Sequence, residues 1–323
     1  MKAIAQEEFG PPDILELMEV DKPAVKDDEV LVRVRAASPN PWDWHFMRGM
    51  PYISRPQAGW RKPKNRVLGS DMAGEVEAVG RAVTRFRPGD HVFGFVGHGA
   101  FAEYASVPQD ALATKPSDLT FEQSATVPLA AMTALQGLRN EGGLQPGERV
   151  LIVGASGGVG TFAVQIAKWL GGHVTGVCST RNLELVRSIG ADQVIDYTQE
   201  DYTQSGEKYD LIFQLAGTTS ATAFRRVLTR RGRLVLSSGD SSGRFIGPVD
   251  RVLKALLLTP FVSQSFRVLS FERSSDDLEL LSELIQAGKV TPVIDKRFSL
   301  IETPEAIRYL ETGRARGKLV IAV

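Results

Sequence analysis

A cluster of glycines between an apolar run and a helix-like segment constrains this chain more than any other feature. Residues 149–153 read Arg-Val-Leu-Ile-Val, glycines follow at positions 154, 157, 158 and 160, and residues 161–170 have helical apolar spacing. Glycines permit a tight turn and a close backbone approach to a pyrophosphate, which the N–H groups of a helix N-terminus attract. The alternative is a tight turn that only packs the helix on a sheet. We favour a dinucleotide-binding loop whose contacts come from Ala155, Ser156, Gly157, Gly158 and Val159.

The chain changes character near residue 122. Short strand-like segments separated by turns precede this point and favour a small, irregular β-barrel or sandwich. Beyond it, six apolar strand-like runs alternate with helical segments, a pattern typical of a doubly wound parallel sheet. Two helical segments and a final strand complete the chain. The predicted fold class is therefore α/β, with domain limits at 1–122, 123–272 and 273–323.

The residues after the second strand of that sheet indicate which dinucleotide is bound. NAD-binding sheets carry an Asp or Glu there, which holds the ribose 2′-hydroxyl. Residues 177–182 read Val-Cys-Ser-Thr-Arg-Asn, without a carboxylate. Ser179 and Arg181 suit a 2′-phosphate, so the sequence predicts NADPH rather than NADH. Tyr197, after the third strand, is expected to close over the same phosphate. A turn serine, a solvated arginine and a surface tyrosine are the alternatives. Asn182 is suited to cap the next helix.

Composition disfavours several other classes of protein. Lys+Arg and Asp+Glu are equal at 38 each, so the formal net charge is zero and electrostatic binding to nucleic acid is disfavoured. The single cysteine, Cys178, rules out an intramolecular disulfide and suits a reducing compartment. The first eight residues lack the apolar region of a signal peptide, and no apolar run approaches the roughly 20 residues that cross a bilayer. We therefore expect a cytoplasmic protein with no membrane or nucleic-acid partner.

Five short motifs follow one another along the chain, and their order and spacing are informative together. They are Ser-Pro-Asn-Pro-Trp-Asp at 38–43, Leu-Gly-Ser-Asp-Met-Ala-Gly at 68–74, Arg-Pro-Gly-Asp at 87–90, Gly-Ala-Phe-Ala-Glu-Tyr at 99–104 and the glycine loop at 154–160. Together they resemble the zinc-free quinone oxidoreductase branch of the medium-chain dehydrogenase/reductase superfamily, over essentially the whole chain. The resemblance implies a GroES-like catalytic domain formed by the N-terminal part and the tail, and a Rossmann domain between them in sequence. It also implies an active-site cleft between the domains and a homodimer.

The resemblance bears on the metal as well. Zinc-containing relatives place a cysteine shortly after the third barrel strand and a His-Glu pair in the later glycine segment. Residues 37–44 contain no cysteine here, and the later segment carries Ser70 and Asp71. We therefore expect no catalytic zinc. A simple alcohol or ketone is hard to polarise without a metal, so a conjugated acceptor is the more plausible substrate. Hydride added to a quinone or an enone leaves negative charge on oxygen, which a donor must meet.

The resemblance implies where the other site residues lie. Asn40 is expected to orient the substrate or contact its oxyanion, with His45 and Tyr52 as candidate proton donors or relays. A buried turn asparagine and a packing histidine are the alternatives. Asp43 is expected to organise this loop through backbone hydrogen bonds. Thr133, opening the helix that enters the cofactor domain, is expected near the nicotinamide. Further cofactor contacts are expected from Leu215, Ala216, Gly217, Ser238 and Lys318, with a surface lysine as the alternative for the last.

The leading interpretation is a metal-independent, NADPH-dependent reductase of quinones or α,β-unsaturated carbonyls. Two other functions stay open. One is an alcohol dehydrogenase with a lost or unusual metal site. The other is an NADPH-binding sensor or scaffold with little turnover.

Overall fold

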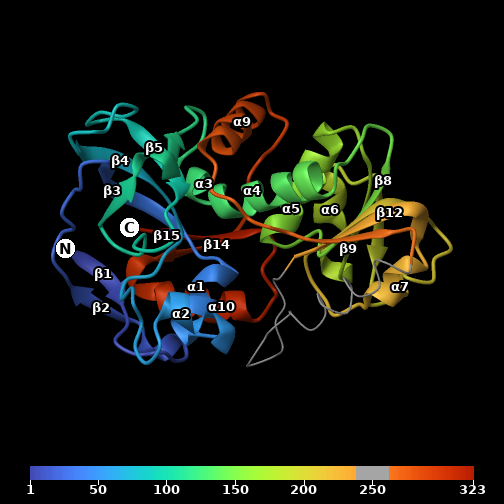
Figure 1. Ribbon diagram of the computed structural model, residues 1–323, viewed down its shortest axis with the longest axis horizontal. Helices are drawn as coiled ribbons and strands as arrows, with labels where there is room; N and C mark the ends of the chain where they lie inside the picture. Colours follow the sequence, from blue (N-terminus) through green and yellow to red (C-terminus); the bar gives the residue numbers. More distant parts are fainter. Residues whose placement is uncertain (238–261) are drawn as a thin grey trace. The chain divides into compact units, whose positions relative to one another are not determined.

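The computed structural model describes residues 1–237 and 262–323, which form two compact units (Figure 1). The boundary between the units lies after Met132, later than the expected position at residue 122. The reason is that helix α3 (Phe121–Ala125) packs against strands of the first unit. Among the described residues, no helix is both long and apolar enough to cross a membrane. The first unit comprises Met1–Met132, Glu272–Gly288 and Pro292–Val323, and the second comprises Thr133–Phe271 and Lys289–Thr291.

The second unit is built on a six-stranded sheet in which every neighbouring pair of strands is parallel. The strands lie in the order β10-β9-β8-β11-β12-β13, so the direction of strand order reverses between β8 and β11. In open α/β sheets, ligands bind at the carboxyl ends of the strands beside this reversal. The predicted doubly wound sheet is confirmed. The strands are β8 Arg149–Val153, β9 His173–Cys178, β10 Gln193–Asp196, β11 Tyr209–Gln214, β12 Leu228–Leu236 and β13 Ser265–Val268.

Apolar residues of these strands are buried, and helices pack against the sheet. Leu151, Ile212 and Leu234 are fully buried in one core cluster, as continuous apolar runs in a parallel sheet require. Helix α5 packs against β8 and β9, α6 against β9 and β10, and α7 against β12. The helices are α4 Pro128–Gln136, α5 Gly158–Trp169, α6 Leu183–Ser188 and α7 Ala221–Arg225.

Strand β12 pairs irregularly with β11. Its pairing with β11 jumps from Tyr209 opposite Leu228 to Leu211 opposite Arg233. The Arg231-Gly232 pair therefore lies in a bulge within the strand, because an inserted segment leaves the ladder and the strand then resumes. Ser238 lies outside the described residues.

The first unit contains a mixed sheet that the tail of the chain completes. Strands run in the order β14-β15-β3-β4-β5-β7, and β6 also pairs with β3. The long strand β3 pairs with β6 through Glu29–Arg33 and with β15 through Ala36 and Ala37. The strands are β1 Lys2–Ala5, β2 Glu16–Glu19, β3 Glu29–Ser38, β4 Asp71–Val79, β5 His91–Phe95, β6 Tyr104–Pro108, β7 Leu112–Thr114, β14 Ile294–Ser299 and β15 Lys318–Ala322. The helices, besides α3, are α1 Pro41–Arg48, α2 Arg55–Ala58, α9 Ser275–Gln286 and α10 Thr303–Glu311.

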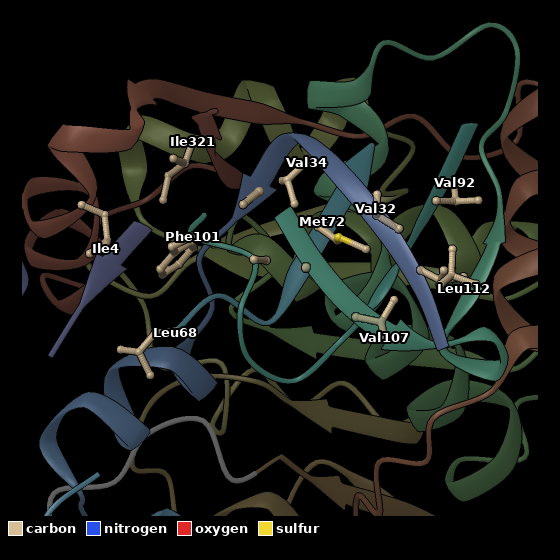
Figure 2. Packing of buried hydrophobic residues seen from close by; sticks show 14 of the residues in the cluster. Ile4, Val32, Val34, Leu68, Met72, Val92, Phe101, Val107, Leu112 and Ile321 are labelled. Carbon is tan, nitrogen blue, oxygen red and sulfur yellow. The ribbon is translucent and has the colours of Figure 1, made fainter. Parts of the chain in front are cut away.

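An apolar core holds the strands of the first unit together, as Figure 2 shows. Val32 and Val34 on β3 lie near Met72 on β4, and Ile321 brings the C-terminal strand into the same cluster. Residues more than 200 positions apart in sequence thus share one core. This arrangement fixes the first residue of β15, Lys318, against the loop that follows β3.

Candidate functional site

The glycines of the 154–160 loop serve two different purposes. Gly154 has φ of +90°, and a Cβ there would lie 2.8 Å from the Cβ of Ala216. A Cβ at Gly160 would lie 2.1 Å from the carbonyl oxygen of Gly154. At Gly157 the nearest atom would be 3.5 Å away, so the backbone there borders open space. Two glycines therefore pack the loop and a third leaves it accessible, as a bound pyrophosphate requires.

The other residues of this loop divide in the same way. Ala155 is fully buried, and its N–H donates to the carbonyl of Val177 at 3.0 Å. Ala155 therefore packs inside the loop, and its burial does not favour the cofactor contact expected for it. Helix α5 begins at Gly158, which puts the N–H groups of Gly158 and Val159 in the first turn, where no intrahelical acceptor exists. These two residues keep the geometry predicted for anion binding.

Asn182 joins the glycine loop to the end of β9. Its Nδ2 donates to the Oγ of Ser156 at 2.9 Å and to the Oγ of Ser179 at 3.3 Å. Asn182 is the N-cap residue of α6, as predicted, but its side chain makes no capping hydrogen bond. Asn182 is 4% exposed, and its Oδ1 has no hydrogen-bond partner within the described residues. A buried acceptor without a partner costs stability, so it points to a ligand that donates to it.

A carboxylate that the sequence did not reveal also lies at this edge of the sheet. Asp196 ends β10 and pairs in register with Cys178, the last residue of β9. Its Oδ2 accepts the hydroxyl of Thr180, and its Oδ1 accepts the N–H and the hydroxyl of Thr198 at 2.9 and 2.7 Å. These bonds, led by that from Thr180, lower the pKa of Asp196 below its ordinary value, so the group is ionised at neutral pH.

The remaining residues predicted to bind the cofactor fall into two groups. Leu215, Ala216 and Gly217 follow β11 and border the glycine loop, because Leu215 N–H donates to Val153 at 3.0 Å and Ala216 lies against Gly154. Arg181 and Tyr197 lie exposed beyond the ends of β9 and β10. We call the loop 154–160, the segment 179–182, Asp196 and the residues 215–217 the cofactor edge.

Thr133 does not open its helix. Helix α4 begins earlier, at Pro128, in agreement with the preference of proline for the first helical turn. Thr133 lies in the second half of α4 and is nearly buried, and it is the first residue of the second unit.

Cys178, at the end of β9, is also buried, which raises the pKa of its thiol to about 11 and keeps it protonated at neutral pH.

The first unit holds a separate group of buried polar side chains, which we call the polar cluster: Asn40, Asp43, Ser70, Asp71 and Lys318. The sheet register assembles it. Ser38 at the end of β3 pairs with Asp71 at the start of β4, and Ile321 of β15 pairs with Ala37. Continuing that antiparallel register brings Lys318 opposite Asn40.

Hydrogen bonds connect every member of the polar cluster. Lys318 Nζ donates to Asn40 Oδ1 and lies 3.8 Å from Asp71 Oδ2. Asn40 Nδ2 faces three acceptors: Asp71 Oδ2 at 2.9 Å, Ser70 Oγ at 3.0 Å and the carbonyl of Ser38 at 3.2 Å. Because an amide nitrogen carries two hydrogens, Asn40 has no spare donor in this arrangement.

Asp43 organises the loop before α1, as predicted. Its carboxylate accepts the N–H of Asn40 at 2.7 Å, the N–H of Gly69 at 3.2 Å and the hydroxyl of Ser70 at 2.9 Å. Asp71 in turn accepts the N–H of Leu129 at 3.1 Å. Both carboxylates thus tie separate segments of backbone to one point.

Burial governs the electrostatics of the polar cluster. It raises the pKa of Asp43 to about 7 and that of Asp71 to about 6, and it lowers the pKa of Lys318. The attraction between Lys318 and Asp71 opposes both desolvation effects. Lys318 is 4% exposed, so the alternative of a surface lysine is wrong. Its ammonium points into the polar cluster, and its contact with a cofactor phosphate stays a prediction.

His45 and Tyr52 lie outside the polar cluster. His45 Nδ1 donates to the carbonyl of Met50 at 2.9 Å, and the ring stacks on Trp44 at 3.7 Å. Burial lowers the pKa of His45, so the ring is neutral at pH 7 and its Nε2 is an acceptor. Tyr52 is 43% exposed and its ring lies 5.3 Å from the Arg55 guanidinium. The structure does not bring these two residues into contact with Asn40.

Aromatic rings gather beside this segment. Trp42 lies 4.9 Å from Phe46 and 5.5 Å from Phe95 between ring centroids, and His98 lies 4.6 Å from Phe46. Burial lowers the pKa of His98 to about 4, which makes it a neutral member of an apolar wall. Within the described residues, no three His, Cys, Asp or Glu side chains gather to hold a metal ion.

Known proteins are similar to this chain over nearly its whole length. The alcohol dehydrogenase GroES-like domain family matches residues 26–117, and the zinc-binding dehydrogenase family matches residues 189–321. The 2-methylene-furan-3-one reductase of Solanum lycopersicum is 34% identical over 99% of this chain and 79% of its own length.

This chain belongs to the quinone oxidoreductase-like branch of the medium-chain dehydrogenase/reductase superfamily. Among solved structures of this branch, the quinone oxidoreductase from Coxiella burnetii has a TM-score of 0.88 and 31% identity, covering 100% of this chain and 99% of that one. The Escherichia coli quinone oxidoreductase complexed with NADPH has a TM-score of 0.86 and 25% identity, covering 100% of both chains. The predicted family and the combination of a GroES-like domain with a Rossmann-like sheet are confirmed.

Proposed function

We propose that this chain is a metal-independent, NADPH-dependent reductase of quinones or α,β-unsaturated carbonyls. The observation that carries the proposal is the cofactor edge, where an accessible glycine backbone and the unpartnered Oδ1 of Asn182 meet at the carboxyl ends of β8, β9 and β11. Relatives named for quinones and for a methylene-furanone, and a solved relative complexed with NADPH, support the same chemistry.

The residues present fit a nicotinamide dinucleotide. Gly157, Gly158 and Val159 would face its pyrophosphate, and Asn182 Oδ1 would accept a hydrogen bond from a hydroxyl or N–H group of the dinucleotide. When bound, the reduced nicotinamide supplies a hydride. Additional contacts in this proposal come from Ser156, Ser179, Arg181, Tyr197, Thr133, and Leu215 to Gly217, with Arg181 and Ser179 recognising the 2′-phosphate.

Asn40 acts in this proposal as a positioning residue. Its amide is shared among Lys318, Asp71, Ser70 and the Ser38 carbonyl, so it fixes where α1 begins. That helix carries Trp42, Phe46 and His45, which border the substrate region of the first unit. A fixed α1 orients these side chains without a contribution from the Asn40 amide to the oxyanion itself.

Protonation of the reduced substrate requires a group that carries a proton at neutral pH. His45 is neutral with its proton on Nδ1, so its Nε2 relays a proton only after it has accepted one. Tyr52 is the partly exposed hydroxyl of the same region. We propose a relay in which His45 Nε2 takes a proton from solvent and passes it to the reduced substrate, with Tyr52 as the second candidate donor.

In this proposal the chain holds no catalytic zinc, because the side chains at the corresponding positions do not form a set of zinc ligands. Ser70 and Asp71 stand in the segment where zinc-containing relatives carry a His-Glu pair. Both side chains are bound within the polar cluster: Ser70 to Asn40 and Asp43, and Asp71 to Asn40 and the N–H of Leu129. Zinc needs at least three Cys, His or carboxylate ligands, and within the described residues no three such side chains gather there.

Stopped-flow oxidation of NADPH against a panel of 1,2- and 1,4-quinones, enals and enones tests the function. We expect turnover with at least one of these classes, slower turnover with NADH, and no gain from added Zn²⁺. Activity with simple alcohols that requires a bound metal would favour the alcohol dehydrogenase. Tight NADPH binding without turnover across the panel would favour the sensor or scaffold. A homodimer and a cytoplasmic location stay predictions, the first testable by sedimentation equilibrium.

A further inference from the structure

The end of β10 brings a carboxylate to the place where the sequence shows none. NAD-binding sheets hold the ribose 2′-hydroxyl with an acidic residue at the end of the second strand. Here that strand, β9, ends in Cys178, but Asp196 of β10 lies directly beside it in register. The N–H of Tyr197 also donates to the carbonyl of Cys178 at 3.1 Å, which fixes the two strand ends together.

Two threonine hydroxyls occupy the acceptor positions of this carboxylate. Thr180 binds Asp196 Oδ2, Thr198 binds Asp196 Oδ1, and the two hydroxyl oxygens lie 3.1 Å apart. Asp196 is buried, whereas Thr180 and Thr198 are exposed. Thr180 is therefore an exposed residue that covers Oδ2, and it belongs to segment 179–182 of the cofactor edge.

This covered carboxylate affects the two coenzymes differently. A ribose 2′-hydroxyl needs a carboxylate lone pair within its reach, and the Thr180 hydroxyl competes with it by taking one of those on Oδ2. A 2′-phosphate needs positive charge, and a neighbouring carboxylate opposes the attraction of Arg181 even when its oxygens are hydrogen-bonded. Asn182 links the same segment to Ser156 of the glycine loop, so these groups share one side of the sheet.

We propose that Asp196 and its Thr180 cover together set the preference between NADPH and NADH. Thr180 withholds the carboxylate from the ribose hydroxyl and so weakens NADH. The charge of Asp196 limits the affinity for NADPH. The inference rests on the proposed function, because it assumes that the cofactor edge binds a nicotinamide dinucleotide.

Dissociation constants from isothermal titration calorimetry test this without turnover. Thr180→Val removes the hydroxyl at constant shape, so we expect NADH to bind at least threefold more tightly and the ratio of Kd(NADH) to Kd(NADPH) to fall at least fivefold. Asp196→Asn removes the charge, so we expect NADPH to bind about threefold more tightly, with NADH changed less than twofold. Thr180→Ser keeps the hydroxyl and should retain the wild-type ratio.

A matched control exists five residues further along the chain. Asp201 accepts the N–H and hydroxyl of Thr203 at 2.9 and 2.7 Å, in the same local pattern as Asp196 with Thr198, but away from the strand end. Asp201→Asn should leave both dissociation constants unchanged. Adenosine 2′,5′-bisphosphate and adenosine 5′-monophosphate, which carry only the adenosine end, should reproduce the shifts seen with the whole coenzymes.

The outcomes separate the inference from the proposed function. Wild-type protein that binds both coenzymes, with ratios in Thr180→Val and Asp196→Asn within twofold of wild type, would overturn the inference alone. Equal shifts in Asp201→Asn would also overturn it, because they would reflect a general loss of charge. Wild-type protein that binds neither coenzyme nor adenosine 2′,5′-bisphosphate would overturn the proposed function and the inference together.

Discussion

The polar cluster and the cofactor edge use similar side chains in opposite ways. In the polar cluster, Asn40 is 3% exposed and both ends of its amide are bound within the protein. At the cofactor edge, Asn182 is equally buried, but its Oδ1 has no partner in the part of the chain that the structure describes. A closed set of hydrogen bonds fixes structure, whereas an incomplete set is completed by a ligand. The comparison therefore assigns positioning to Asn40 and binding to Asn182.

The largest effect should come from removing a charged side chain from the polar cluster. Lys318→Met leaves Asp71 buried without its cation, and we expect a loss of about 3–5 kcal/mol in the free energy of unfolding. Urea denaturation measures it. The matched control is Lys22→Met, which removes an ion pair with Glu77 in which both side chains are more than a third exposed. That control should cost at most about 1 kcal/mol. A similar small loss in both variants would show that the polar cluster does not hold the first unit together.

The next effect separates packing from binding within one loop. Gly160→Ala forces a methyl against the backbone of Gly154 at 2.1 Å, so we expect a loss of about 1–3 kcal/mol of stability. Gly157→Ala meets no atom closer than 3.5 Å and should leave stability nearly unchanged. The same methyl occupies the accessible side of the loop and should weaken NADPH at least tenfold. Unfolding curves and fluorescence titration of both variants provide the measurement. Unchanged NADPH affinity in Gly157→Ala would contradict the binding role.

These two regions also differ in how far the sequence predicts them. The glycine loop is local: a strand, four glycines and a helix lie within about 20 residues, so the motif carries its own geometry. The fold class, the alternation of six strands with helices and the family follow from such local signals. The separation of packing glycines from the accessible Gly157 does not, because it depends on Ala216, which approaches from another strand.

Contacts across distant strands were not predicted from the sequence. Lys318 was expected to contact the cofactor, but it lies 278 positions from Asn40, and only the register of β15 on β3 brings the two together. Asp196 was not predicted because NAD-binding sheets carry the carboxylate at the end of the second strand, here β9, whereas the neighbouring strand supplies it. For Lys318, the signal available in the sequence was a lysine at the start of an otherwise apolar strand. For Asp196, the sequence carried no signal without the order of the strands in the sheet.

The polar cluster should also give the protein a pH dependence of stability opposite in sign to that of Asp196 at the cofactor edge, whose pKa is lowered. Burial raises the pKa of Asp43 to about 7, so the folded state holds this proton more tightly than the unfolded chain does. Such a group stabilises the fold at low pH, and the contribution is lost as pH rises toward 7. Each unit of net difference is worth about 1.4 kcal/mol. Because the pKa rises by more than one unit, we expect Asp43→Asn to flatten the fall in unfolding free energy between pH 4 and 7.5 by at least that amount.

Thermal or urea unfolding across this pH range provides the measurement for Asp43. The exposed Asp27, which pairs with Arg81 at the surface, offers a control, and Asp27→Asn should retain the wild-type slope. An unchanged slope in Asp43→Asn would mean that its three hydrogen-bond donors outweigh desolvation and keep the carboxylate ionised throughout.

The smallest effect should arise at the exposed rim of the cofactor edge. Arg181→Ala removes the exposed guanidinium of segment 179–182, so we expect Kd for NADPH to rise about tenfold, as for one lost charge-assisted hydrogen bond. Kd for NADH should rise less than twofold, because NADH lacks the 2′-phosphate. Arg187→Ala, an exposed arginine on α6, should change neither constant. Equal losses for both coenzymes in Arg181→Ala would mean that Arg181 supports segment 179–182 rather than the phosphate. The source of any NADPH preference would then have to be sought in Ser179 and the Thr180 cover.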